Sequence, residues 1–377
     1  MSKKVKYFAS ESVCSGHPDK VCDQISDSIL DAVLAKDPNG RVAVEALVAN
    51  DHIVLAGEVS SSAKVDFEKI ARQTIKELGY IHPEWGFSYE SPIENYIHTQ
   101  SIEIAVGVDN DGAGDQGMMF GFAVNESEEF MPLPITIAHE LTALIDESRE
   151  NNSIKYLRPD GKAQVVVKYD ENDNPIGIEH VTIAVPHDEN IKLNQVREDI
   201  TDKVINPILD KYGYTISSDK IVINGTGVWN TPGPSSDCGL TGRKIVVDGY
   251  GGYSRVGGGA FSGKDPSKVD RSGAYAARYI AKNIVANKLA DRVEVSLAYY
   301  IGAKYPVLSE INTFGTEKID IEKLNKIAAQ LLSPSVKNIV DSLNLKRPIY
   351  KQTARNGHFG KKDFPWEKVS KILTKND

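Results

Sequence analysis

A glycine-rich stretch that runs into charged residues carries the strongest chemical signal in the sequence. Residues 257–270 read GGGAFSGKDPSKVD. Glycine has no Cβ, so such a run can adopt left-handed backbone angles and let amide N–H groups approach an anion closely. Lys264 and Lys268 would add positive charge. The pattern therefore predicts a loop that binds a polyphosphate.

The same stretch has a second interpretation. Residues 258–264 fit the GxxxxGK half of the phosphate-loop motif, but Asp265 stands where that motif has a Ser or Thr for magnesium, so an ordinary phosphate loop is not indicated. Alternatively, the glycines form a mobile loop before a helix that Asp265 or Ser267 caps, with Pro266 near its first position. This stretch alone does not decide between the two.

A second candidate for anion binding lies near the N-terminus. Residues 16–20 read GHPDK and precede apolar residues at helical spacing, so Pro18 fits the first turn of a helix. Free N–H groups and the dipole at a helix start favour anions, so His17 could contact phosphate and Asp19 could hold magnesium. Alternatively, His17 caps the helix and Asp19 complements its dipole. These residues alone favour the second interpretation.

Three irregular segments are further candidates. Residues 100–117, QSIEIAVGVDNDGAGDQG, combine glycines with short acids and predict a lid or hinge, or else an ordinary connection. Residues 157–162 form a turn that carries Lys162. Residues 225–244 gather Gly and Pro around Trp229 and Asp237 and end in TGRK. An irregular stretch of that length in a compact protein is usually functional.

Hydrophobic periodicity places these segments among strands and helices. Pairs of strands followed by helices recur in each third of the chain, which favours a pseudo-repeated α+β protein over an alternating βα fold. Asp23, Asp27 and Asp31 recur every fourth residue of the helix after Pro18, which predicts a solvated face. The expected strands are 42–48, 53–59, 118–124, 164–169, 176–185, 221–223 and 293–300; further helices are expected near 66–79, 134–149, 193–204, 269–284, 318–332 and 336–343.

Composition excludes some classes of protein. The 377 residues contain 52 Asp and Glu against 44 Lys and Arg, which argues against a broad nucleic-acid-binding surface. The N-terminal residues lack the apolar core of a signal peptide, and no apolar run is long enough to span a bilayer. We therefore expect a cytoplasmic protein that binds neither nucleic acid nor membrane.

Four motifs together resemble the S-adenosylmethionine synthetase family: GHPDK at 16–20, GAGDQG at 112–117, DCGLTGRK at 237–244 and the stretch at 257–270. They occur in the family's order, and the resemblance covers nearly the whole chain. It implies α+β architecture with three similar domains in a pseudo-threefold arrangement, each a mixed sheet with helices on one face. The expected segments are an N-terminal domain (1–101), a gating loop and linker (102–117), a central domain (118–230) and a C-terminal domain (231–377). It also implies a homodimer with shared active sites, often doubled to a homotetramer.

The resemblance implies that methionine sulfur attacks the ribose C5′ of ATP in line and expels triphosphate, which the enzyme hydrolyses to pyrophosphate and phosphate. A thioether needs no general base, so the catalytic demand is to stabilise the departing polyanion. The positions that match catalytic residues are His17, Lys162, Arg243 and Lys264. The ATP-binding positions are His17, Asp160, Gly161, Lys162, Val228, Trp229, Asp237, Arg243, Lys244, Ala260 and Lys264.

The methionine and metal positions carry over in the same way. The methionine-binding positions are Glu58, Gln100, Asp115, Asp237, Lys268 and Ile301. Asp19 and Asp270 match the magnesium site, for which the resemblance implies two ions, and Glu45 matches the potassium position. Residues 100–111 correspond to the gating loop, whose closure would exclude water.

The chain departs from the family pattern in two places. Gly227-Val228-Trp229 stands where the family usually has Gly-Arg-Phe, so an Arg is absent, while Trp229 still offers a ring for adenine. The gating loop is also shorter than the common form. Two other functions share the anion-binding signals: an ATP-dependent kinase, which needs an acceptor base, and a non-catalytic ATP-binding subunit, which would be expected to have lost these lysines and acids.

Overall fold

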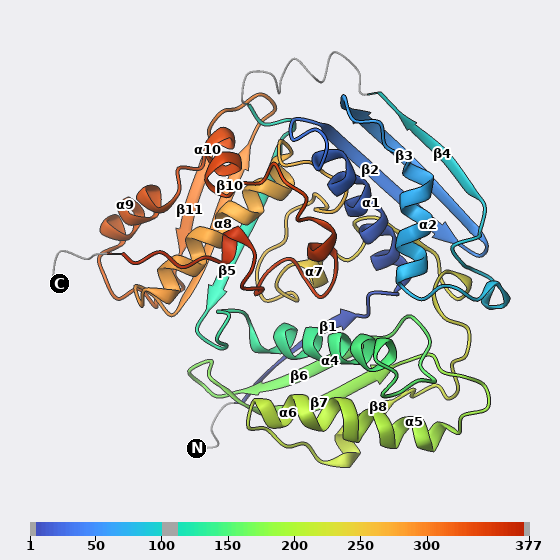
Figure 1. Ribbon diagram of the computed structural model, residues 1–377. Coiled ribbons are helices and arrows are strands. Elements are labelled where there is room, and N and C mark those ends of the chain that lie inside the picture. Colours follow the sequence, from blue (N-terminus) through green and yellow to red (C-terminus); the bar gives the residue numbers. More distant parts are fainter. Residues whose placement is uncertain (1–4, 100–111, 373–377) are drawn as a thin grey trace.

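The computed structural model describes residues 5–99 and 112–372. They form three separate β-sheets, each with helices packed on it (Figure 1). The sheets surround a central region that holds the short helix α7 (Ile245–Asp248) and the C-terminal segment. This arrangement confirms the predicted α+β architecture of three similar units.

The first sheet has the order β4-β3-β2-β9. Strands β2 (Arg41–Ala49) and β3 (His52–Ser60) form an antiparallel hairpin, as predicted, while β4 (Ile93–His98) runs parallel to β3 and β9 (Gly239–Leu240) pairs with β2. Even-numbered residues of β2 are buried beneath α1 (Pro18–Leu34), and α2 (Phe67–Glu77) packs beside α1. Successive side chains of a strand point to opposite faces, so Glu45 and Leu47 face away from the helices.

The second sheet has the order β1-β6-β7-β8. Its strands are β1 (Lys6–Val13), β6 (Lys162–Tyr169), β7 (Pro175–Ala184) and β8 (Ile221–Ile223). Helices α4 (Leu133–Glu150), α5 (Leu193–Ile200) and α6 (Asn206–Lys211) share one hydrophobic core with β6 and β7. A π-helical turn, η2 (Thr201–Ile205), joins α5 to α6 where one continuous helix was predicted.

The third sheet has the order β11-β10-β5. Strands β5 (Gly117–Val124) and β11 (Leu308–Asn312) flank β10 (Arg292–Tyr299), and α8 (Val269–Ala286) packs on β5 and β10. Helices α9 (Ile321–Leu331) and α10 (Val336–Ser342) extend this unit. The remaining short helices are η1 (Pro83–Trp85), η3 (Ser218–Lys220), η4 (Gly233–Ser235), η5 (Lys351–Ala354) and η6 (Pro365–Glu367).

Strands from distant parts of the chain complete the sheets. β1 belongs to the first 13 residues yet pairs with β6, and β9 returns from residue 239 to pair with β2. The domain boundaries proposed from the sequence stay a prediction, but these crossings tie the three units together. They also bring residues 237–244 to the start of α1.

The prediction that Asp23, Asp27 and Asp31 form a solvated face is wrong. Asp23 is ion-paired with Lys20, Asp27 is ion-paired with a buried arginine of α8, and Asp31 accepts hydrogen bonds from two backbone amides of the C-terminal segment. The three acids are therefore covered by other parts of the chain, and the C-terminal segment provides the partners of Asp31. In the part of the chain that the structure describes, no helix is both long and apolar enough to cross a membrane.

Candidate active site

His17 caps helix α1 and is almost fully buried, with 2% of its surface exposed. Its Nδ1 accepts a hydrogen bond from the backbone N–H of Asp19 at 3.2 Å, which leaves the ring proton on Nε2. Burial, together with the positive charges of Lys244 and Lys162, lowers the pKa of His17 to about 3. The imidazole is therefore neutral at pH 7 and offers Nε2–H as a hydrogen-bond donor. His17 therefore caps the helix, as the second interpretation expected, and its contact with phosphate stays a prediction, for which the separate Nε2–H group is the donor.

Asp19 anchors the segment that follows β9. Its carboxylate accepts hydrogen bonds from Lys244 Nζ at 2.6 Å and from the Leu240 amide at 2.9 Å, and Arg243 Nε lies 3.8 Å away. Burial disfavours the charged carboxylate, but these hydrogen bonds outweigh it and hold the pKa of Asp19 below its ordinary value. The structure thus brings together His17, Asp19, Arg243 and Lys244, which the sequence placed in separate motifs.

The turn at 157–162 packs against the same helix start. A Cβ on Gly16 would lie 2.7 Å from the backbone nitrogen of Asp160, so the two loops are in direct contact. Asp160 has a φ of 99° and accepts hydrogen bonds from the amides of Gly161 and Gly233 at 2.7 and 3.0 Å. Burial raises the pKa of Asp160 to about 7. Lys162 begins β6 opposite Val13 of β1.

In the glycine stretch, one residue from 257 to 263 has positive φ: Gly263, at 81°. Of these seven residues, Gly263 alone uses the left-handed angles that glycine allows. The glycines instead permit close approach of neighbouring groups. A Cβ on Gly257 would lie 2.2 Å from the Met118 carbonyl oxygen, and a Cβ on Gly259 would lie 2.1 Å from the Asp270 carboxylate. The loop is pressed against β5 and α8, so its shape is fixed by packing.

The charged end of this loop forms two ion pairs. Lys264 Nζ lies 2.6 Å from Asp270, and Lys268 pairs with Asp265. Helix α8 begins at Val269 and has no side-chain cap, so the alternative in which Asp265 or Ser267 caps it is wrong. Asp265 instead accepts the amides of Val42 and Ser267 at 2.8 and 2.9 Å.

A buried ion pair that the sequence did not reveal links the two site regions. Arg271 of α8 donates to both carboxylate oxygens of Asp27 on α1, at 2.7 and 2.8 Å, and both side chains are fully buried. The same pair holds the loop, because Asp27 accepts the Gly263 amide at 2.8 Å and Arg271 donates to the Lys264 carbonyl at 3.1 Å. In the sequence, Asp27 is followed four residues later by Asp31 and not by an apolar residue, so nothing nearby indicated that it is buried. Its partner Arg271 lies 244 residues away.

Ala260 connects the glycine stretch to the TGRK segment. A Cβ on Gly242 would lie 2.4 Å from the Ala260 side chain. Within the described residues, no hydrogen bond or ion pair joins the side chains of Lys264, Lys268 or Asp270 to those of His17, Asp19, Arg243 or Lys244. One chain therefore presents two neighbouring cationic groups.

Among the predicted methionine residues, Asp115 and Ile301 lie on segments that are joined by backbone hydrogen bonds, since the Ala113 amide donates to the Ala303 carbonyl at 2.8 Å and the Gly302 amide to the Ala113 carbonyl at 2.7 Å. Glu58 on β3 points to the same sheet face as Glu45, since Glu58 pairs with Ala43 and Glu45 with Ala56. Asp115 and Asp237 are exposed, and Ile301 follows β10 with 58% of its surface exposed. Gln100 and residues 102–111 of the predicted gating loop lie outside the described residues.

Val228 and Trp229 lie on the loop after β8. Val228 is 60% exposed, so the position that departs from the family pattern faces away from the core. Trp229 Nε1 donates to the Thr231 carbonyl at 2.6 Å, and the Trp229 carbonyl accepts the His187 amide at 2.9 Å. The indole is thus oriented by its own loop.

The carboxylates assigned to metals occur singly. No three His, Cys, Asp or Glu side chains gather within residues 5–99 and 112–372 to hold an ion by themselves. Asp19 and Asp270 each contact a lysine, so each carboxylate already faces positive charge. Magnesium is commonly held by one or two carboxylates plus substrate phosphates, which fits such a donor set. Glu45 is exposed and would need further oxygen ligands for potassium.

Comparison with protein families identifies the chain. Residues 5–102 match the S-adenosylmethionine synthetase N-terminal domain, residues 110–229 its central domain and residues 231–368 its C-terminal domain. The chain belongs to the S-adenosylmethionine synthetase family. It is thus a transferase of the methionine adenosyltransferase type, with S-adenosylmethionine synthesis from ATP and methionine as the family activity. The family uses magnesium and potassium.

Proposed function

We propose that this chain joins methionine to ATP by direct displacement. The methionine sulfur forms a bond to the ribose C5′ while the C5′–O bond breaks, and its electron pair leaves with the triphosphate oxygen. The thioether sulfur is neutral and carries no proton, so the attack needs no general base. The triphosphate is then hydrolysed to pyrophosphate and phosphate before release. The cluster of His17, Lys162, Arg243 and Lys244 around the start of α1 is the observation that carries this proposal.

Each member of that cluster has a defined task in the proposed step. Charge grows on the bridging oxygen as the C5′–O bond breaks, and preorganised donors lower the barrier most where charge develops. The neutral His17 donates Nε2–H to that oxygen, which follows from its capped Nδ1. Lys162, Arg243, Lys244 and Lys264 bind the phosphate oxygens. Asp160 holds Gly161 and Gly233 in place around the nucleotide.

Metal ions would add positive charge to the same polyanion. Asp19 and Asp270 supply hard carboxylate oxygens for two magnesium ions, and Glu45 supplies one for potassium. Lys244 and Lys264 would then release these carboxylates and turn to the phosphates, since a lysine side chain is long and rotatable.

We also propose that two copies of the chain complete each active site. The sheet face that bears Glu45 and Glu58 is turned away from the helices, and it carries the exposed apolar side chains of Leu47 and Tyr96. Exposed apolar side chains grouped on one sheet face favour a partner. A homodimer through this face would set the Lys264–Asp270 group of one chain against the His17–Asp19 group of the other, and two such dimers would give a homotetramer.

The remaining assignments define where each substrate lies. Trp229 stacks on adenine beside Val228, and Ala260 lines the nucleotide. Glu58, Asp115 and Asp237 receive the methionine ammonium, Gln100 and Lys268 its carboxylate, and Ile301 its apolar end. Charged partners for both the ammonium and the carboxylate orient the amino acid as well as bind it. Residues 100–111 would close over the bound substrates.

Product identification tests the reaction directly. The purified protein is incubated with ATP, methionine, magnesium and potassium, and the products are identified by mass and phosphate analysis. We expect S-adenosylmethionine with equal amounts of pyrophosphate and phosphate. ADP with a phosphorylated acceptor would point to a kinase instead, and unchanged bound ATP would point to a non-catalytic subunit.

Lys264→Ala tests whether Lys264 stabilises the departing triphosphate. We expect turnover to fall by about 100-fold or more, because one lost charge contact to a developing anion costs about 3 kcal/mol. The KM for methionine should change by less than about threefold. Lys318→Ala is the matched control, since Lys318 forms an exposed ion pair with Asp291 far from the site. Equal effects on turnover and methionine affinity would contradict the assigned role.

A further inference from the structure

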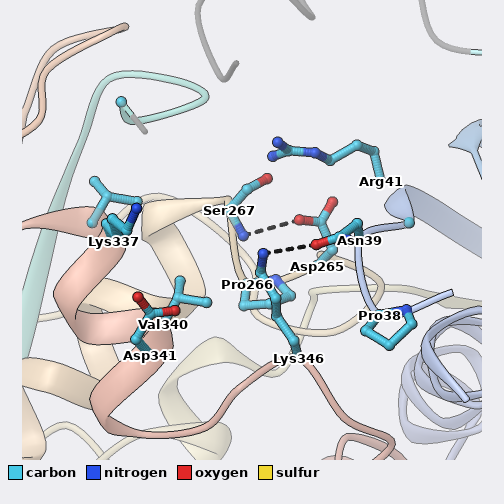
Figure 2. A pocket seen from close by; sticks show the side chains of 13 residues that line it. Pro38, Asn39, Arg41, Asp265, Pro266, Ser267, Lys337, Val340, Asp341 and Lys346 are labelled. Carbon is cyan, nitrogen blue, oxygen red and sulfur yellow. Dashed lines mark hydrogen bonds between the residues drawn. The ribbon is translucent and has the colours of Figure 1, made fainter. Parts of the chain in front are cut away.

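A cavity of about 320 Å³ lies next to the end of the glycine stretch (Figure 2). Its walls come from the connection between α1 and β2, from helix α10 and from residues 265–267. None of the residues assigned above to the triphosphate lines it. A cavity of this volume is at the lower end of the range for ligand sites, which suits a small metabolite.

The side chains around the cavity carry a positive balance. Arg41, Lys337 and Lys346 line it together with Asp265 and Asp341. Asp265 is already ion-paired with Lys268, which lies outside the cavity wall. Lys337 has an interaction of its own and is left out of the balance in the same way. Arg41 and Lys346 therefore face Asp341 as the remaining carboxylate, and the cavity favours an anion.

Two polar groups in the wall lack a partner within the described part of the chain. The Arg41 guanidinium forms no hydrogen bond or ion pair there, and the Ser267 hydroxyl oxygen is buried without a hydrogen-bond partner. In Figure 2 the Ser267 hydroxyl points toward the side of the cavity that holds the Arg41 guanidinium. A buried hydroxyl without a partner is costly, so a ligand that bonds to it is favoured.

Lys346 is held in position at the opposite side. Its Nζ donates to Asn39 Oδ1 at 2.8 Å, which fixes the ammonium beside the cavity (Figure 2). Between the cations lie apolar surfaces of Pro38, Val336 and Val340. The cavity thus combines anion-binding donors with a short apolar wall.

We propose that this cavity binds a small phosphate monoester, a metabolite of the size of a sugar phosphate. Arg41 presents the planar guanidinium that matches phosphate oxygens in a bidentate way, and the Ser267 hydroxyl adds a neutral donor. The ester carbons lie along the apolar wall, and Lys346 neutralises the rest of the charge. This site is separate from the one that binds the triphosphate of ATP.

Direct binding tests the proposal without relying on activity. The full-length protein is titrated with D-ribose 5-phosphate by calorimetry, with magnesium and a saturating non-hydrolysable ATP analogue present to fill the triphosphate site. We expect one equivalent to bind per chain. Arg41→Ala should weaken binding at least tenfold, while Lys155→Ala, which removes an exposed lysine elsewhere, should leave it unchanged.

Three outcomes would overturn the proposal. One is that Arg41→Ala, shown by its unfolding midpoint to be as stable as the wild type, binds ribose 5-phosphate equally well. Another is that binding appears only without the ATP analogue, which would place it at the triphosphate site. The third is that ribose or citrate binds and ribose 5-phosphate does not, which would exclude phosphate as the recognised group.

Discussion

The Asp160 carboxyl is buried at a left-handed turn, and its pKa is raised to about 7. A group whose pKa is raised in the folded state contributes stability that is fully present below the unfolded pKa and is lost as the pH rises through the folded pKa. We therefore expect the wild type to lose on the order of 2–4 kcal/mol of unfolding free energy from this group between about pH 4 and pH 7.

Asp160→Asn isolates this effect. The Gly161 and Gly233 amides donate to different oxygens of Asp160, so the single amide oxygen of Asn keeps one of these hydrogen bonds and the variant starts with a loss of stability that does not depend on pH. Asn tolerates positive φ, and its side chain does not titrate. Urea unfolding across pH 4–8 should show the variant gaining stability relative to the wild type as the pH rises. The lowered pKa of His17 acts in both proteins and cancels in the difference. A difference that is flat with pH would contradict the expected titration.

The sequence predicted the types of residue at the site better than their partners. His17 and Asp19 could be placed at a helix start because Pro18 and the apolar spacing mark that start. Their contact with Lys244 could not be predicted, because it depends on β9 pairing with β2 across about 190 residues. The acids of α1 were misassigned for the same reason, since each of them has a partner beyond residue 240 in addition to any partner within the helix.

At the scale of elements, the glycine stretch depends on Gly263 more than on its run of three glycines. A Cβ at Gly263 would lie 1.9 Å from the Val44 carbonyl oxygen, and its φ is 81°, whereas a Cβ at Gly258 would meet no atom within 4 Å. We expect Gly263→Ala to cost about 1–3 kcal/mol of unfolding free energy and to reduce turnover, because the loop must shift away from β2. Denaturant unfolding and steady-state assays measure both.

Gly258→Ala is the matched control for that prediction, and its stability should lie within about 0.5 kcal/mol of the wild type. It adds the same methyl group to the same loop in open space. If the two variants were equally stable and equally active, the loop would tolerate a side chain at either position, and the tight packing against Val44 would not matter for function.

Helices α1 and α8 are joined by the Asp27–Arg271 pair. Arg271→Met leaves a buried carboxylate without its cation, so we expect a loss of about 3–5 kcal/mol in unfolding free energy. Adding Asp27→Asn should recover part of this loss, because the neutral amide is cheaper to bury. Lys318→Met, which breaks an exposed pair, should cost at most about 1 kcal/mol. A small effect of Arg271→Met would show that the pair does not hold the helices together.

Elements with strong local patterns were predictable, and those defined by distant pairing were not. Strands β2 and β3 alternate buried and exposed residues around a tight turn, and α2 begins at Asp66, whose side chain accepts the Lys69 amide. Strands β1, β4 and β11 were missed. β1 finds its partner about 150 residues away, and β11 is mostly exposed, so neither has a local hydrophobic signal.

At the scale of the whole molecule, the proposed dimer makes a quantitative prediction about mixed subunits. His17→Asn keeps an acceptor for the helix cap but removes the imidazole donor, and Lys264→Ala removes the cation of the other group. Each variant alone should be nearly inactive. If each site takes His17 from one chain and Lys264 from the other, a mixed dimer has one site with both changes and one intact site.

Random exchange of equal amounts of the two variants makes half of the dimers mixed, so about a quarter of wild-type activity should return. Activity is measured after the subunits are mixed under mild denaturant and refolded together, with each variant refolded alone as the control. Recovery near a quarter requires that the two cationic groups act across the interface. If both groups of one site came from the same chain, every site in the mixture would carry one change, and no activity would return.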